Sequence, residues 1–180
     1  MANSPFLFEQ KLWDETRITL FEQSVQTPES LSKKLVSLGP GYIKESIFEL
    51  FEDNIRNYYP VLPLGFDDEP KNLRHLKFLN GQVWRWVRPI IGVDHADKNH
   101  IRLEQRSFPC GPSSIDTIAN TAFYIGLLHF YTHTKKPIEE LMSFQTISEN
   151  FYNCAKLGTK AEVIWIRLEL MFKNFYMIPF

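Results

Sequence analysis

Apolar residues recur with helical spacing along much of the chain. Between Tyr42 and Tyr58 they lie at three- and four-residue intervals opposite a charged face, which predicts an amphipathic helix. Thr27 followed by Pro28 is typical of a helix start, and we expect that helix to end near Gly39. Further helices are predicted from the turn at 110–114 to about His133, from Pro137 to Leu157 and from Thr159 to Tyr176. Residues 1–26 predict a loop that leads into a strand or a short helix.

A two-residue pattern replaces the helical one in the middle of the chain. The segment 82–88 is dense in Val and Trp, and 101–108 alternates apolar and polar residues, so we expect an antiparallel pair of strands. The connection 89–100 is too long for a tight hairpin. Pro89 has no N–H to donate to a ladder, so it should end its strand or lie at an edge.

The segment 59–79 differs from both patterns. It contains three prolines, a glycine and three consecutive acidic residues, which predicts a long irregular connection. A length of 180 residues favours one domain, and this segment is the candidate for an internal boundary. Helices separated from one short antiparallel sheet predict the α+β fold class.

Composition narrows the class of protein. The chain is 44% hydrophobic and 23% charged, which is typical of a soluble globular protein, and its net charge of −1 gives no electrostatic basis for binding nucleic acid. It has no run of about 18 apolar residues that would predict a membrane span. Two cysteines and a start unlike a signal peptide favour a cytoplasmic location. The 15 Phe residues suggest a core together with an apolar surface that another chain covers.

The second strand pattern carries the strongest candidate chemistry. Because side chains alternate between faces, Arg102, Glu104 and Arg106 should share one face. A carboxylate between two guanidinium groups stays ionised and could bind Mg²⁺, while the arginines could hold a carboxylate or phosphate. The alternative is a solvated face with inert ion pairs.

The first strand pattern offers further arginines. Trp84, Trp86 and Arg88 should share a face, with Arg85 on the other, so an arginine on an aromatic strand could clamp an anion. The alternative is a core strand with an arginine at its rim. His129 and His133 have a spacing that can bind zinc, but the Glu of an H-E-x-x-H motif is missing.

Several motifs occur together in one order. The runs NGQVWRWVRP at 80–89, IRLEQR at 101–106 and PCGPS at 109–113 are preceded by LWDETR at 12–17 and followed by FYIGL at 123–127. Together they resemble the glutamate–cysteine ligase-like carboxylate–amine ligases over about residues 2–160. The resemblance implies a glutamine-synthetase-like fold, whose antiparallel sheet forms an open funnel. It also implies that ATP and Mg²⁺ activate a carboxylate as an acyl phosphate, which an amine then attacks.

The same resemblance assigns roles to residues of the two strands. Glu104 would be a Mg²⁺ ligand, and Arg106 would hold the substrate carboxylate or the transferring phosphoryl group. Arg88 and Arg85 would stabilise phosphate charge, with Arg17 and Arg102 as further candidates for the same anionic site. The implied partners are ATP, glutamate and an amine such as cysteine.

The chain also departs from the family. Members are much longer, and their N-terminal portions supply further metal ligands. We therefore expect this chain to be the C-terminal part of a longer ligase fold, inactive alone, that associates with a missing N-terminal half or with copies of itself. The alternative hypothesis is a non-catalytic module that binds a partner through an exposed apolar surface.

Overall fold

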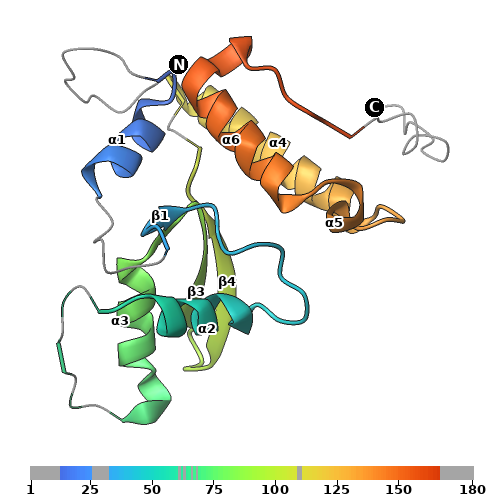
Figure 1. Ribbon diagram of the computed structural model, residues 1–180. Helices are drawn as coiled ribbons and strands as arrows, with labels where there is room; N and C mark the ends of the chain where they lie inside the picture. Colours follow the sequence, from blue (N-terminus) through green and yellow to red (C-terminus); the bar gives the residue numbers. More distant parts are fainter. Residues whose placement is uncertain are drawn as a thin grey trace. The chain divides into compact units, whose positions relative to one another are not determined.

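The computed structural model describes residues 13–25, 33–60, 62, 64–65, 67, 69–108 and 111–166. The described residues fall into two structural units (Figure 1), one spanning Arg17–Phe108 and the other containing 13–16 and 111–166. Both helices and short two-stranded sheets are present, which is compatible with the α+β class. The division lies near Phe108, whereas the segment 59–79 lies inside the first unit.

The first unit carries the strands and the helices nearest to them in sequence. Its elements are α1 (Thr16–Ser24, whose first residue belongs to the other unit), β1 (Val36–Ser37), α2 (Phe48–Asn57), the 3-10 turn η1 (Pro70–Asn72), α3 (Arg74–Gln82), β2 (Trp84–Arg85), β3 (Val87–Val93) and β4 (Asn99–Gln105). Buried apolar residues from α1, β1, α2 and the strand region form its core; among them are Ile18, Val36, Leu50, Phe51, Val83 and Trp86.

The expected antiparallel pair is present as β3 and β4, with different bounds. Arg88 lies opposite Glu104, and Pro89 lies opposite Leu103 inside β3, which continues to Val93. The carbonyl of Pro89 accepts a hydrogen bond from Asn80 Nδ2 at 2.7 Å, on the side away from β4. A residue of an antiparallel strand directs its N and its C=O to the same side, so the missing N–H of Pro89 removes no bond from the β3–β4 ladder. Because β3 continues to Val93, the connection between β3 and β4 is shorter than the predicted 89–100.

A second sheet pairs β1 with β2 in parallel, with Val36 opposite Trp84. The helix expected to run from Thr27 to Gly39 is therefore wrong in its described part, because residues 36–37 are a strand. The amide of Trp84 donates to the carbonyl of Leu35 at 3.0 Å, and the amide of Trp86 donates to that of Ser37 at 3.1 Å. Contacts between segments far apart in sequence thus decide the conformation of residues 35–37.

Two helices of this unit differ from their predictions. The helix expected from Tyr42 begins only at Phe48, because the Glu49 carboxylate accepts backbone amides of residues 44–46 and holds them in a turn. These hydrogen bonds also hold the pKa of Glu49 below its usual value. Helix α3 lies partly in the segment predicted to be irregular, and it follows Leu73, whose φ is 52°.

The second unit is helical in its described part. It contains α4 (Ser114–Thr132), α5 (Ile138–Leu141), α6 (Phe144–Leu157) and the 3-10 turn η2 (Gly158–Lys160). The helix expected from Pro137 to Leu157 is interrupted at residues 142–143, because the Ser143 side chain caps a new helix by accepting from the amide of Thr146.

The last predicted helix, Thr159–Tyr176, is also wrong in its described part. Residues 161–166 are not helical, and the Asn150 side chain exchanges two hydrogen bonds with the backbone of Ile164. Residues 167–176 lie outside the described part of the chain. Among the described helices, none combines the length and the apolar character that crossing a bilayer requires.

Candidate functional site

Two arginines of the first unit, Arg88 and Arg106, pair with one glutamate, and the charge of Arg17 acts on Arg106. We call Arg17, Arg88, Glu104 and Arg106 the arginine cluster. Arg88 Nε donates to Glu104 Oε2 at 3.0 Å, and Nη2 forms an ion pair with the same oxygen at 2.8 Å. Arg106 Nε lies 3.3 Å from the same oxygen. Arg17 projects from the first turn of α1 and donates to the carbonyl of Phe108 at 3.4 Å. Three guanidinium groups with one carboxylate leave an excess of two positive charges.

The strand geometry explains how these residues meet. Arg88 and Glu104 are direct cross-strand partners, so their side chains project from the same face of the β3–β4 pair. Arg106 follows Glu104 by two residues and therefore lies on that face as well. Its amide donates to the carbonyl of Trp86 at 2.9 Å, which extends the pairing just beyond β4.

Aromatic rings support Arg106 from one side. The Arg106 guanidinium carbon lies 3.4 Å from the centroid of the Trp84 ring, and Trp84 stacks on Phe21 of α1 at 3.6 Å. Trp86 packs edge-on against both rings. The Arg106 side chain is only 10% exposed, whereas that of Glu104 is 39% exposed. The rings thus hold the guanidinium in one orientation and remove most of its water.

The electrostatics of the arginine cluster favour an added anion. Burial lowers the pKa of Arg106, the charges of Arg88 and Arg17 lower it further, and Glu104 acts in the opposite direction, with a net pKa of about 10. Arg106 is therefore still protonated at neutral pH, but its charge is under-compensated. An oxyanion bound here would restore the balance that one carboxylate does not provide.

Two buried hydrogen-bond donors lie beside this charge. Nη1 of Arg106 and the indole Nε1 of Trp84 are both buried, and within the described residues neither has an acceptor. Buried donors are normally paired, and an unpaired one costs about 1–3 kcal/mol. Unpaired buried donors in an arginine cluster indicate the place of a ligand oxygen or of a water.

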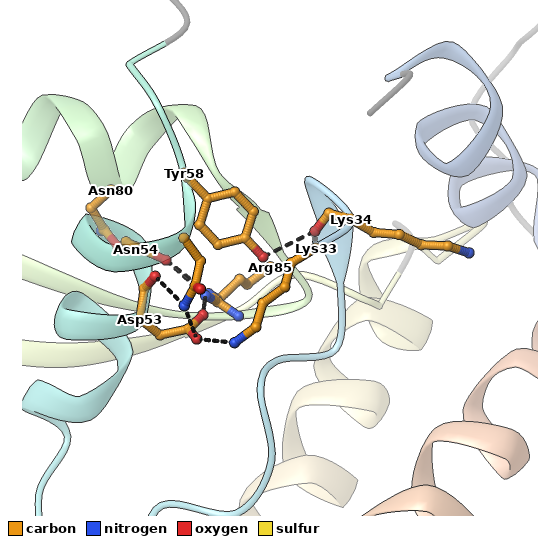
Figure 2. A network of polar contacts seen from close by, with 8 residues as sticks. Lys33, Lys34, Asp53, Asn54, Tyr58, Asn80 and Arg85 are labelled. Carbon is orange, nitrogen blue, oxygen red and sulfur yellow. Dashed lines mark hydrogen bonds and ion pairs between the residues drawn. The ribbon is translucent and has the colours of Figure 1, made fainter. Parts of the chain in front are cut away.

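Arg85 contacts α2 in place of the arginine cluster, and Figure 2 shows it beside Asp53 and Asn54. It is 1% exposed, and its guanidinium donates to Asp53 and to Asn54 of α2. Burial raises the pKa of Asp53, but hydrogen bonds from Lys33 and Arg85 outweigh that effect, so the pKa lies below its usual value. Phosphate binding by Arg85 stays a prediction: alternation along the strand turns it toward α2, where Asp53 and Asn54 accept from its Nε and Nη2.

The same network ties the strands to the helices around them. Asn54 Nδ2 donates to Asn80 Oδ1 of α3 at 3.0 Å, and the Tyr58 hydroxyl donates to the carbonyl of Lys34 at 3.0 Å, as Figure 2 shows. Asn80 in turn reaches the carbonyl of Pro89 in β3. The network is therefore structural, and it fixes β2 and β3, which carry Trp84 and Arg88.

Arg102 also lies apart from the arginine cluster. It is exposed and lies opposite Ile90, and its Nη1 is 3.0 Å from Nε2 of His100. His129 and His133 lie next to each other on α4, with their ring centroids 4.2 Å apart.

The residues that the structure describes do not form a complete magnesium site. Glu104 Oε2 already accepts a hydrogen bond from Arg88 Nε and forms an ion pair with Arg106. In the described part of the chain, no group of three or more His, Cys, Asp or Glu side chains could hold a metal ion. Mg²⁺ requires several well-placed oxygen ligands, which the described residues do not supply by themselves, and Glu104 as one of its ligands stays a prediction.

An apolar hollow elsewhere on the first unit is the main competing site. Its volume is about 350 Å³, and its lining is almost wholly apolar, with Ile55, Leu76 and Phe78 among its residues. One titratable side chain, His75, reaches it. Such a lining has no means of binding a charged substrate, whereas the arginine cluster does.

All four residues of the arginine cluster are candidates from the sequence, but the stacked rings that support Arg106 are not. The sequence predicts an arginine clamp on the aromatic strand of Trp84, with a core strand as the alternative, but it does not give the register that sets Trp84 under Arg106. The shared face of Trp84, Trp86 and Arg88 was the available signal.

Comparisons with known proteins leave the function to be argued from the residues. No family model, curated protein or solved structure matches this chain. The arginine cluster is therefore the observation from which a function is proposed.

Proposed function

We propose that this chain supplies the anion-binding part of an ATP- and Mg²⁺-dependent carboxylate–amine ligase of the glutamate–cysteine ligase type. The observation that carries the proposal is the arginine cluster, with its excess of two positive charges and a nine-tenths buried Arg106. The motifs at 80–89 and 101–106, on which the family resemblance depends, are the segments that carry Arg88, Glu104 and Arg106. The same proposal includes the fold: the strands of this chain would form part of a glutamine-synthetase-like funnel.

The chemistry of such a ligase matches a cationic site. In the first step a carboxylate oxygen attacks the γ-phosphorus of ATP, which forms an acyl phosphate and releases ADP. In the second step an amine attacks the acyl carbon, and phosphate leaves as an amide forms and a proton is lost. Both steps concentrate negative charge on oxygens, and phosphoryl transfer depends mainly on positioning and neutralising that charge.

The described side chains would divide this work. Arg106, held by the Trp84 ring, would bind the oxygens of the carboxylate or of the transferred phosphoryl group. Arg88 would neutralise the developing charge, while Glu104 holds both guanidinium groups in place. Arg17 would add long-range attraction. Further ligands for Mg²⁺ would come from a second chain or segment, because the described residues do not provide them.

An activity measurement tests the proposal. The full chain is co-expressed with the product of the adjoining upstream reading frame, and ADP formation is followed with ATP, Mg²⁺, glutamate and cysteine. We expect glutamate-dependent ADP formation, lost in Arg88→Gln and unaffected in Arg102→Gln, an exposed arginine on the same sheet. Equal rates for the two variants, or ADP formation independent of glutamate, would contradict the proposal.

A second candidate function is that of a non-catalytic interaction module, and α4 favours it. Ile115, Ile118, Ala122 and Ile125 are exposed and spaced by three and four residues, so they form one apolar face. Exposed apolar faces of this kind mark surfaces that bind partners. Light scattering should then show an oligomer for the wild type and a monomer for Ile118→Glu. A wild-type monomer that binds no other protein would exclude this function.

A further inference from the structure

The strongest unexplained observation concerns the two unpaired donors beside the arginine cluster. Arg106 Nη1 and Trp84 Nε1 are buried, and the described structure gives neither an acceptor. The guanidinium nitrogens that face Glu104 differ from these two, because they have a partner. Arg106 Nε faces Glu104, and Arg88 Nε and Nη2 face the same carboxylate. The protein therefore pairs one side of the Arg106 guanidinium with Glu104 and leaves the buried Nη1, on the other side, without an acceptor.

The two open donors lie close together. The Arg106 guanidinium carbon is 3.4 Å from the Trp84 ring centroid, Nη1 is one bond away from that carbon, and Nε1 is an atom of the ring. Their polarity is also the same, because both nitrogens donate and neither can accept. A group that satisfies both must present at least two acceptor oxygens. Carboxylate and phosphate oxyanions have this form.

Water is the alternative occupant, and the charge of the site argues against it. Burial together with the charges of Arg88 and Arg17 already makes the protonated state of Arg106 less favourable. A neutral water could pair with a donor but would leave the positive charge uncompensated. An anion pairs with the donor and compensates the charge, so it gains more from this position than water does.

We infer that Trp84 is a ligand-binding residue, whose indole N–H and the Nη1 of Arg106 together bind a single oxyanion. The indole has two functions in this arrangement: its ring face carries the guanidinium, and its N–H contacts the ligand. Identifying the oxyanion with the reacting carboxylate or phosphoryl group depends on the proposed ligase function. The existence of the oxyanion-binding site does not depend on the proposed ligase function.

Nuclear magnetic resonance of the tryptophan indole groups tests the inference directly. The Trp84 indole N–H resonance of the full chain is assigned as the one lost in Trp84→Phe, which keeps an aromatic face under Arg106. Inorganic phosphate and acetate are then titrated separately at constant ionic strength. We expect a saturable shift of the Trp84 resonance with at least one of them, while the Trp13 and Trp165 resonances stay unchanged. The anion that binds more tightly shows whether the site takes a phosphoryl or a carboxylate group.

Substitutions at Arg106 and Trp84 test whether these two nitrogens donate to the anion. Arg106→Lys keeps the charge but has no Nη1, and Trp84→Phe has no indole N–H, so calorimetry should show anion affinity lowered about tenfold by each substitution. Arg102→Lys, on the same strand and outside the arginine cluster, should change affinity less than twofold. If Arg106→Lys fails to fold, the titration of the wild-type Trp84 resonance still decides the matter.

The outcomes separate this inference from the proposed function. A Trp84 resonance that neither anion moves, as a bound water would give, overturns the inference, and so does unchanged affinity in Trp84→Phe. A shifting resonance in a protein that never forms glutamate-dependent ADP refutes the ligase proposal alone. Glutamate-dependent ADP formation with an unmoved resonance refutes the oxyanion site alone.

Discussion

Arg85→Met tests how much the buried polar network contributes to the unit that carries the arginine cluster. Arg85 is fully buried, and its guanidinium donates to Asp53 and, through two nitrogens, to Asn54. Methionine is unbranched and apolar, so it retains much of the packing while it removes the charge and every donor. The change in stability therefore reports the polar interactions more than a cavity.

The expected loss in the free energy of unfolding follows from the groups that lose a partner in Arg85→Met. Asp53 keeps its ion pair with Lys33. The side-chain oxygen Oδ1 of Asn54, a residue that is 1% exposed, loses both guanidinium donors. Breaking a buried ion pair costs about 3–5 kcal/mol, and a buried unsatisfied oxygen costs about 1–3 kcal/mol. The two costs overlap and Lys33 compensates part of the first, so we expect the free energy of unfolding to fall by about 3 kcal/mol.

Urea denaturation followed by tryptophan fluorescence measures this loss. Lys33→Met is the matched control, because the Lys33 side chain is 41% exposed and such an ion pair contributes about 1 kcal/mol or less. The double variant Asp53→Asn/Arg85→Met should be more stable than Arg85→Met, since it no longer leaves a carboxylate under-paired. Equal losses for Arg85→Met and Lys33→Met would refute the reasoning.

Three further predictions concern pH and the helix ends. Because folding lowers the pKa of Asp53, its contribution to stability is present above the unfolded-state pKa of about 3.9 and is lost as the pH falls through the folded-state pKa. The stability difference between wild type and Asp53→Asn in urea should thus shrink in acid, and a constant difference would contradict this. Ser113→Ala removes the capping box that Ser113 and Asp116 form at the start of α4, and it should lower the free energy of unfolding by about 1 kcal/mol; an unchanged thermal midpoint would count against the cap. Gly158→Ala places a side chain at φ +57°, where its Cβ would overlap the Asp14 carboxylate, so a loss of about 1–3 kcal/mol is expected in urea denaturation. A Gly158→Ala protein as stable as wild type would be the opposing result.

Features that depend on neighbouring residues could be predicted from the sequence. The turn before α4 was expected to cap a helix, and the Ser113 side chain and the Asp116 carboxylate do so within four residues of chain. Residues 101–106 were expected to place Glu104 and Arg106 on one face, and Glu104 contacts both Arg106 and Arg88. In each case the controlling interaction is local, or it follows from the two-residue period of a strand.

Competition between local signals explains part of what was missed. Pro137 begins a helix, but Ser143 offers a second cap six residues later, and the chain uses both. The segment after Gly158 has a helical pattern of apolar residues, yet the Asn150 side chain binds the backbone of Ile164 in its place. A helical pattern does not exclude a side chain that satisfies the backbone better.

The sequence by itself determined which face each strand residue takes, and the tertiary structure decided what that face meets. Alternation was enough to separate Arg85 from Trp84 and Arg88. It did not reveal that α2 would present Asp53 and Asn54 to Arg85. Nor did it reveal that Trp84 would lie between Phe21 and Arg106. Side-chain alternation is a property of the local backbone, whereas register, burial and the choice of partner depend on contacts between residues 21, 53, 84 and 106, which only folding brings together.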